Sequence, residues 1–91
     1  MTQIIDHPER GRFELPVEGG DVAIAAYELG PGTMAITHVV VPAHADGKGV
    51  GGKLAAHSIE VARQRGLKVI PACPFVASWF KRNPKLAALL A

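Results

Sequence analysis

The stretch ADGKGVGGKLAAHSIEVARQRG, residues 45–66, decides the fold. It follows a run rich in β-branched residues, 36–41, so a strand should lead directly into a helix. Glycines at a helix start let a ligand approach the backbone, and the first N–H groups of the helix remain free to donate. Together with the positive end of the helix dipole, these donors predict a site for a phosphorylated ligand. The glycines concerned are Gly47, Gly49, Gly51 and Gly52.

The glycine spacing matches neither of two common phosphate-binding motifs. Lys48 and Lys53 add positive charge, but glycine and leucine follow them where a Walker-type loop has Ser or Thr. A dinucleotide fingerprint needs an acidic residue about 20 positions further on, where Lys68 stands. The alternative is a turn that only connects a strand to a helix. Each glycine would weaken such a helix start by roughly 0.5–1 kcal/mol, so the ligand site is favoured.

Turn residues divide the rest of the chain into short elements. Turns at 18–21 and 30–32 separate three expected strands, and Gly66 should end the first helix as a C-cap. Because a helix connects the third strand to a fourth, these two strands should be parallel. Pro74 opens a short second helix. The expected strands are 12–17, 22–29, 33–41 and 67–70, the expected helices are 49–65 and 75–82, and a last helical turn or tail covers 85–91.

These elements predict an α/β fold, with an antiparallel three-stranded meander, a crossover helix, a parallel fourth strand and one or two short C-terminal helices. Period-two alternation places His38 and Val40 on the same face of the third strand as Met34 and Ile36. The expected core residues are Val22, Ile24, Met34 and Ile36 from the strands, and Val50, Leu54, Ser58, Val61 and Ala62 from the first helix.

Length and composition indicate one globular domain over residues 1–91, with 1–11 expected to be flexible. The 91 residues are 48% hydrophobic and 20% charged, which suffices for a single core and argues against disorder. No apolar run approaches the roughly 20 residues of a membrane span, and the N-terminus lacks a signal-peptide core. No membrane partner is therefore expected. One cysteine forms no internal disulfide, so the expected compartment is the cytoplasm.

The net charge of +2 hides an asymmetry between the two halves of the chain. Residues 1–46 carry two Arg against seven Asp/Glu, or −5, whereas residues 47–91 carry eight Lys/Arg against Glu60 alone, or +7. A basic half fits phosphate binding. Its charges are dispersed over a helix, a loop and the tail, and this dispersal disfavours nucleic acid as a partner.

Two segments at the right separation resemble the GNAT superfamily of N-acetyltransferases, and more closely its small single-domain members. They are HVVVPAHADGKGVGGKL (38–54) and VIPACPFVASWFKRNP (69–84), and the resemblance extends over roughly residues 12–90. The superfamily motif Arg/Gln-x-x-Gly-x-Gly/Ala binds the pyrophosphate of acetyl-CoA through backbone amides, and Gly49 and Gly51 fall on its two small positions. A segment Pro-x-Cys-Pro-aromatic-Val follows the last strand of the small members, as residues 71–76 do here.

The resemblance implies transfer of an acetyl group from acetyl-CoA, bound in the cleft between the third and fourth strands, to an amine. Asp46 stands where the family has Arg or Gln, so we expect weakened CoA binding. Val40 replaces a glutamate of the small relatives that could act as a base, so the alternative is an acyl-CoA-binding module with little or no turnover. The expected cofactor-binding residues are Val39, Val40, Val41, Gly47, Lys48, Gly49, Val50, Gly51, Gly52, Lys53, Cys73, Pro74 and Phe75.

His38 and Cys73 are the candidate catalytic residues. The ordinary pKa of histidine suits a base, although a strand histidine can equally be hydrogen-bonded in or beside the core. Cys73 precedes the helix that Pro74 opens, and the N-terminus of that helix could acidify its thiol for covalent acyl transfer. The alternative for Cys73 is a small buried residue. No metal is expected, because the histidine spacings match no ligand motif.

The acceptor side is the least determined part of the predicted site. Full-length GNAT enzymes build an acceptor pocket from additional helices and late strands, so here the pocket would be open or completed by a second copy or a partner protein. Lys81, Arg82 and Lys85 could contact the adenosine phosphate of CoA or form a solvated tail. For Trp79 and its aromatic neighbours, core packing is favoured over ligand stacking.

Overall fold

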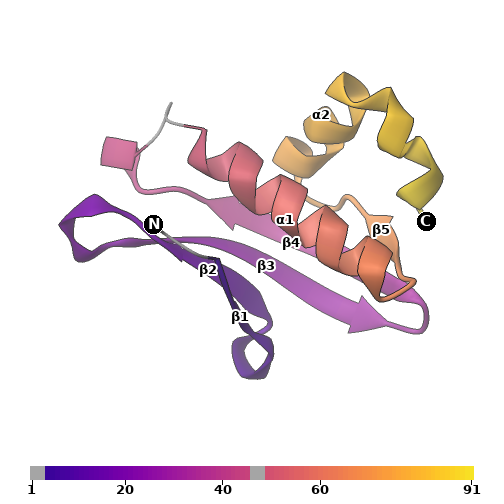
Figure 1. Cartoon of the computed structure of the whole chain (residues 1–91), viewed down its shortest axis with the longest axis horizontal. Coiled ribbons are helices and arrows are strands. Elements are labelled where there is room, and N and C mark those ends of the chain that lie inside the picture. The colour runs from indigo at the N-terminus through magenta and orange to yellow at the C-terminus, as the bar shows by residue number, and fades with distance from the viewer. Residues whose placement is uncertain (1–3, 46–48) are drawn as a thin grey trace.

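The computed structural model describes residues 4–45 and 49–91 of the chain (Figure 1). Its principal elements are β1 Ile5–His7, β2 Arg12–Pro16, β3 Val22–Gly30, β4 Thr33–Val40, α1 Val50–Gln64, β5 Lys68–Ile70 and α2 Pro74–Arg82. Four short 3₁₀ turns complete the described part: η1 Pro8–Arg10, η2 Glu18–Gly20, η3 Ala43–Ala45 and η4 Pro84–Leu89.

In the described residues the sheet has five strands, in the order β1-β2-β3-β4-β5. β1 to β4 form an antiparallel meander, and β5 pairs parallel to β4, as the crossover through α1 requires. The predicted α/β fold class is confirmed. The sheet contains one strand more than expected, since β1 lies in the segment that the sequence left outside the elements.

A β-bulge interrupts the pairing of β3 with β4. Tyr27 pairs with Ile36 and Ala26 with His38, so Thr37 is an extra residue in β4. Its hydroxyl donates a hydrogen bond to the carbonyl of Ala26 at 3.3 Å. One extra residue exchanges the two faces of a strand, because side chains alternate with period two.

The bulge corrects the predicted alternation of β4. Before it, Met34 and Ile36 are fully buried, as expected. After it, Val39 packs against the core, whereas His38 and Val40 are exposed. The expected single face for all four even-numbered residues is therefore wrong beyond Thr37.

The core lies between the sheet and α1, which crosses one face of it (Figure 1). Leu54, Ser58 and Ala62 of α1 are buried as predicted, and the Ser58 hydroxyl donates to the carbonyl of Leu54 at 2.7 Å. The strand partners differ from the expectation. β3 turns Ala23, Ala25 and Tyr27 inward, so the predicted core positions Val22, at 41% exposure, and Ile24 lie on the open face.

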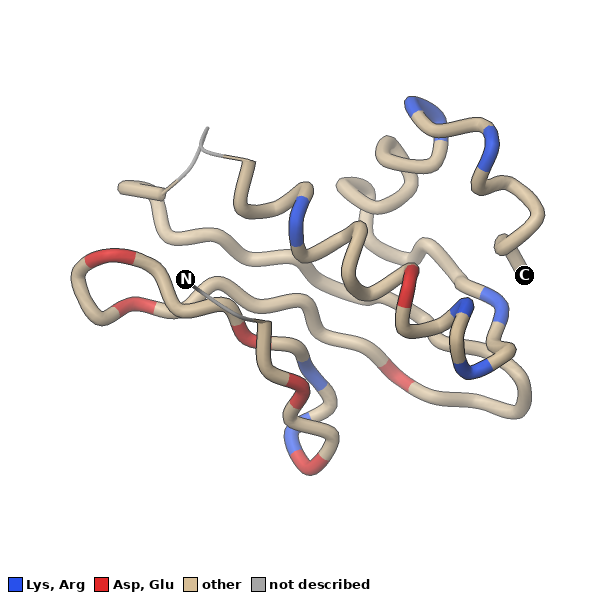
Figure 2. The backbone as a smooth tube through the Cα atoms, in the orientation of Figure 1, with Lys and Arg blue, Asp and Glu red and all other residues tan. Residues whose placement is uncertain are grey.

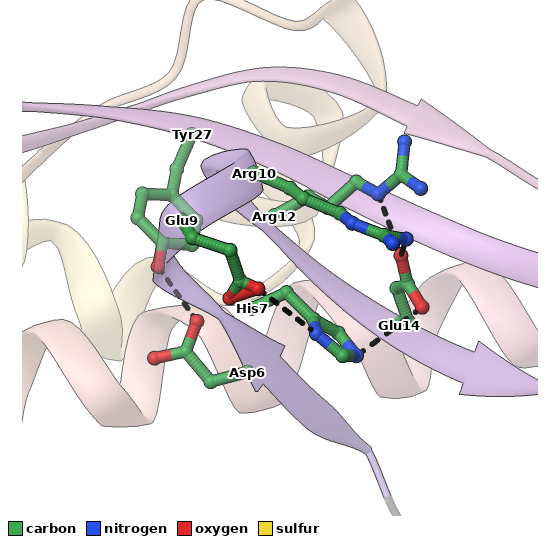
Figure 3. Close-up of polar contacts among 7 residues, drawn as sticks. All are labelled: Asp6, His7, Glu9, Arg10, Arg12, Glu14 and Tyr27. Carbon is green, nitrogen blue, oxygen red and sulfur yellow. Dashed lines mark hydrogen bonds and ion pairs between the residues drawn. The ribbon is translucent and has the colours of Figure 1, made fainter.

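β1 is held by polar side chains rather than by apolar burial (Figure 3). The Tyr27 hydroxyl donates to Asp6 Oδ1 at 2.6 Å, and Arg65 Nη2 at the end of α1 donates to Asp6 Oδ2 at 3.2 Å. On the opposite face, Glu14 of β2 lies 3.3 Å from His7 Nε2 and accepts from Arg12 Nε at 2.7 Å. These contacts explain why hydrophobic patterning did not reveal the strand.

The chain after α2 returns to the sheet. Lys68 Nζ donates to the carbonyl of Ala88 at 2.6 Å, Ala91 N donates to Val69 O at 2.9 Å, and Leu90 forms a parallel bridge with Val69. The C-terminal segment therefore covers part of the outer edge of β5. Within the described ranges, no helix combines the length and the apolar character needed to cross a bilayer.

Candidate functional site

A cleft of about 490 Å³ opens where β4 and β5 part. Their pairing covers residues 33–35 of β4 and all of β5, and one further backbone bond runs from Cys73 N to Ile36 O at 3.0 Å. Beyond this bond the chain turns into α2, whereas β4 continues beside β3. The cleft lies in the space left between β4, the start of α1 and α2. Its lining residues are Val39, Val41, Ala45, Gly49, Val50, Gly51, Gly52, Phe75, Trp79 and Arg82.

The N-terminus of α1 supplies polar backbone groups to this cleft. The first helical bond runs from Lys53 N to Gly49 O at 3.0 Å, so the N–H groups of Val50, Gly51 and Gly52 have no acceptor within the helix. Gly49 is the N-cap, with φ of +77°, a left-handed conformation that side chains disfavour. No acidic side chain stands in the first turn of α1 to neutralise the helix dipole. This arrangement suits an anion.

Gly51 and Gly52 also allow α2 to pack closely on α1. A Cβ added to Gly51 would lie 2.9 Å from Phe75 Cζ, and one added to Gly52 would lie 3.1 Å from Trp79 Cζ3. The glycine-rich start of α1 therefore has a second structural role besides exposing backbone N–H groups.

Arg82 gives the cleft a positive charge. Its guanidinium carbon lies 5.6 Å from the centroid of the Trp79 ring, within the range of a cation–π contact. From the sequence, Arg82 could either contact a phosphate of CoA or belong to a solvated tail. The structure places it in the cleft lining. Lys81 and Lys85 are exposed and lie outside that lining. The sequence indicates this contact through the spacing of Trp79 and Arg82, because residues three apart on a helix lie beside each other on its surface.

The cleft brings together seven of the predicted cofactor-binding residues. They are Val39, Val41, Gly49, Val50, Gly51, Gly52 and Phe75. Val40 lies instead on the open face of the sheet with 52% exposure, and Lys53 and Pro74 are exposed outside the lining. The predicted residues Gly47 and Lys48, with Asp46, lie outside the described residues.

The two catalytic candidates lie apart from the cleft lining. His38 is exposed on the open face of β4, with Nδ1 3.2 Å from Thr37 Oγ1. Since Val39 faces the cleft, the neighbouring His38 side chain points to the other side of the sheet. Cys73 is 7% exposed, forms the N-cap of α2 and packs in the core. Neither residue belongs to the cleft lining.

Sequence reasoning missed Ala45 and the bulge at Thr37. Ala45 is 4% exposed and lines the cleft from η3, and as an alanine in a turn it carried no chemical signal. The bulge decides which valines face the cleft, but residues 39–41 are all valine, so the apolar pattern does not reveal a change of face. Among the described residues, no three His, Cys, Asp or Glu side chains gather in a metal-binding group.

Comparisons with known proteins agree with this geometry. The fold is similar to the NMR solution structure of a GCN5-like protein from Staphylococcus aureus, with a TM-score of 0.76 and 24% identity, covering 98% of this chain and 87% of that chain. A search of curated proteins returns no match. The family model of the GCN5-related N-acetyl-transferases matches residues 12–89, which is most of the chain. This chain therefore belongs to the GCN5-related N-acetyl-transferase family.

Proposed function

We propose that the protein transfers an acetyl group from acetyl-CoA to an amine. The observation that carries the proposal is the cleft itself, in which helix N–H groups without an acceptor inside α1, an arginine and apolar walls converge where β4 and β5 part. A ligand with both phosphates and a long chain that carries apolar groups fits this combination, and membership of an acetyltransferase family supports acetyl-CoA as that ligand.

The ends of the cleft suit the two ends of acetyl-CoA. The N–H groups of residues 50–52 would donate to the pyrophosphate, where the helix dipole favours negative charge. Arg82 would neutralise phosphate charge and is held in place by Trp79. The pantetheine chain would lie along Val39 and Val41, with the thioester toward the point where the strands part.

The transfer step needs an amine that has lost its proton. The amine nitrogen attacks the thioester carbonyl, the new N–C bond forms and the C–S bond breaks, and the departing thiolate takes up a proton. His38 could accept the amine proton only from an acceptor that approaches through the open face of the sheet, because its side chain lies on that face. No other histidine lies on β4.

The second candidate function is an acyl-CoA-binding module with little turnover. The location of His38 and Cys73 outside the cleft lining favours it, as does valine at position 40. Both functions predict binding of CoA, and they differ in whether an added amine accelerates the release of free thiol.

The test combines titration calorimetry with a thiol-release assay. Calorimetry with acetyl-CoA and with CoA measures binding, and no heat at saturating ligand would refute both functions. Thiol release over a panel of small and peptide amines then separates them, since only a transferase releases CoA in an amine-dependent manner. Intact mass of Cys73→Ala beside the wild type tests the covalent route, in which the Cys73 sulfur replaces the CoA sulfur on the acetyl carbon. An acetyl adduct retained in Cys73→Ala would exclude Cys73 as the acceptor.

A further inference from the structure

We infer that Gly52 is a positioning residue, whose missing side chain sets the distance of α2 from α1 and thereby the width of the cleft. The inference rests on the proposed function only for its effect on CoA binding. Its structural basis is the contact between the Trp79 indole and the first turns of α1. The two helices are in contact, and residues of both line the cleft (the helices are labelled in Figure 1).

The contact leaves no room for a methyl group. An ideal Cβ on Gly52 would stand 3.1 Å from Trp79 Cζ3 and 3.5 Å from Cη2, and both atoms belong to the six-membered ring of the indole. At 3.1 Å the indole would have to give by a few tenths of an ångström. An alanine at position 52 therefore either moves the indole or moves α2 as a whole.

The indole of Trp79 has little freedom to move by itself. The side chain packs against the core, and its Nε1 atom is buried without a hydrogen-bond partner among the described residues. Arg82 lies over its ring with the guanidinium carbon 5.6 Å from the centroid. In contrast, the Phe75 ring that faces Gly51 is 37% exposed and can swing its tip outward. Gly52, rather than Gly51, therefore fixes the position of α2.

A displacement of α2 would change the binding site of the ligand. Trp79 and Arg82 both line the cleft, so a shift of α2 moves an apolar wall and the cationic group together. The other explanation for a glycine here is close approach of the ligand to the backbone. Both explanations predict weaker CoA binding for Gly52→Ala. The two explanations differ in whether replacing the Trp79 indole by a smaller ring restores CoA binding.

A double-mutant cycle separates the two explanations. The four proteins are the wild type, Gly52→Ala, Trp79→Phe and the double variant, since phenylalanine removes the part of the indole nearest Gly52. We expect Gly52→Ala to weaken CoA binding about tenfold and the double variant to bind within about threefold of Trp79→Phe alone, because the two sites are coupled through one contact. Unchanged binding in Gly52→Ala, or a loss of about tenfold from Gly52→Ala in both backgrounds, would overturn the inference.

A second readout needs no cofactor, so failure of the proposed function can be told from failure of this inference. The chain has a single tryptophan, and its indole N–H gives one signal in NMR spectra. We expect this signal to move in Gly52→Ala, together with the backbone amides of α2. An unmoved indole signal and unmoved α2 amides in Gly52→Ala would refute the packing role whether or not CoA binds.

Discussion

Tyr27 joins three parts of the chain that are distant in sequence. Its hydroxyl donates to Asp6 of β1 (Figure 3). Asp6 also accepts a hydrogen bond from Arg65 at the end of α1. The ring of Tyr27 is buried in the core, with its centroid 4.9 Å from that of Phe13. Burial, followed by the hydrogen bond to Asp6, raises the pKa of Tyr27 to about 12. The neutral phenol is therefore the form that the folded protein stabilises.

The single tyrosine makes this pKa directly measurable. Ultraviolet absorbance against pH should show the native phenol ionising near a pKa of about 12, and Asp6→Asn should lower this pKa because the nearby negative charge is removed. The pKa in the fold lies above the ordinary value of 10.0, so the stabilisation is full below pH 10 and is lost as the pH rises toward about 12. Tyr27→Phe should lack this loss. A native phenol that ionises at its ordinary pKa would contradict the contact.

Glu14 should contribute to stability in the opposite pH range. The hydrogen bond from Arg12 holds the pKa of Glu14 below its ordinary value of 4.5, and the charges of His7, Arg12 and Arg10 act in the same direction. Its contribution is present above that value and is lost as the pH falls through the lowered pKa. Glu14→Gln should therefore flatten the dependence of the free energy of unfolding on pH below about 4.5, as measured by urea unfolding. Glu28→Gln, at an exposed position of β3, is the control, and an equal flattening there would contradict the assignment.

At the scale of elements, substitutions of Gly49 measure how much the left-handed backbone conformation at the start of α1 costs in folding free energy, without a contribution from steric clashes. Its φ of +77° disfavours side chains, yet no atom of the described residues lies within 4 Å of an added Cβ. Gly49→Ala should lower the free energy of unfolding by about 1 kcal/mol, and Gly49→Asn by less, because asparagine tolerates the left-handed region. Urea unfolding measures both changes.

CoA binding by Gly49→Asn then tests the ligand role of the same residue. A side chain at the helix entrance should weaken binding by more than its small effect on folding, since the ligand approaches the backbone there. Binding equal to that of the wild type would show that Gly49 serves only the helix start.

The elements from β2 to α2 could be predicted from the sequence within one or two residues, because glycines and prolines mark their ends. Gly66, with φ of +69°, follows α1, and Pro74 opens α2 as expected. β1 could not be predicted, since polar contacts to Asp6 and Glu14 hold it and only the folded chain brings these partners together. The part of the candidate site formed by the start of α1 could be predicted from the glycine spacing. The contribution of α2 depends on packing against α1, which no local pattern specifies.

At the scale of the whole molecule, charge is divided between two regions (Figure 2). Apart from Glu60 of α1, the described aspartates and glutamates lie on β1 to β3 and their turns. Apart from Arg10 and Arg12, the described lysines and arginines lie on α1 and its C-cap, β5, α2 and the chain after it. The cleft lies on the basic side, next to Arg82. A phosphorylated ligand should therefore be attracted to the correct side of the molecule before it makes contact.

This division predicts that CoA affinity falls as salt is added. Screening lengths are about 10 Å at 0.1 M salt, so exposed charges such as Arg82 lose much of their effect at higher ionic strength. Arg82→Gln should weaken binding at low salt and reduce the salt dependence, as measured by calorimetry at several salt concentrations. Lys81→Gln makes the same charge change on the same helix outside the cleft lining, and its effect should be smaller. Equal effects of the two variants would argue for a diffuse field instead of a contact.

The bulge at Thr37 adds one residue to β4 that has no opposite partner in β3. Substituting Thr37 loses the contacts of its hydroxyl with Ala26 O and His38 Nδ1, whereas deleting it would remove the extra residue and let His38 follow Ile36 in an unbroken ladder with β3. Val39 and Val41 would then keep facing the cleft, and His38 and Val40 would stay on the open face, because the alternation of side chains is unchanged. This segment should consequently tolerate the loss of Thr37 better than the loss of Val39, which lines the cleft, and urea unfolding of the two single-residue deletion variants should show the smaller loss of stability for Thr37.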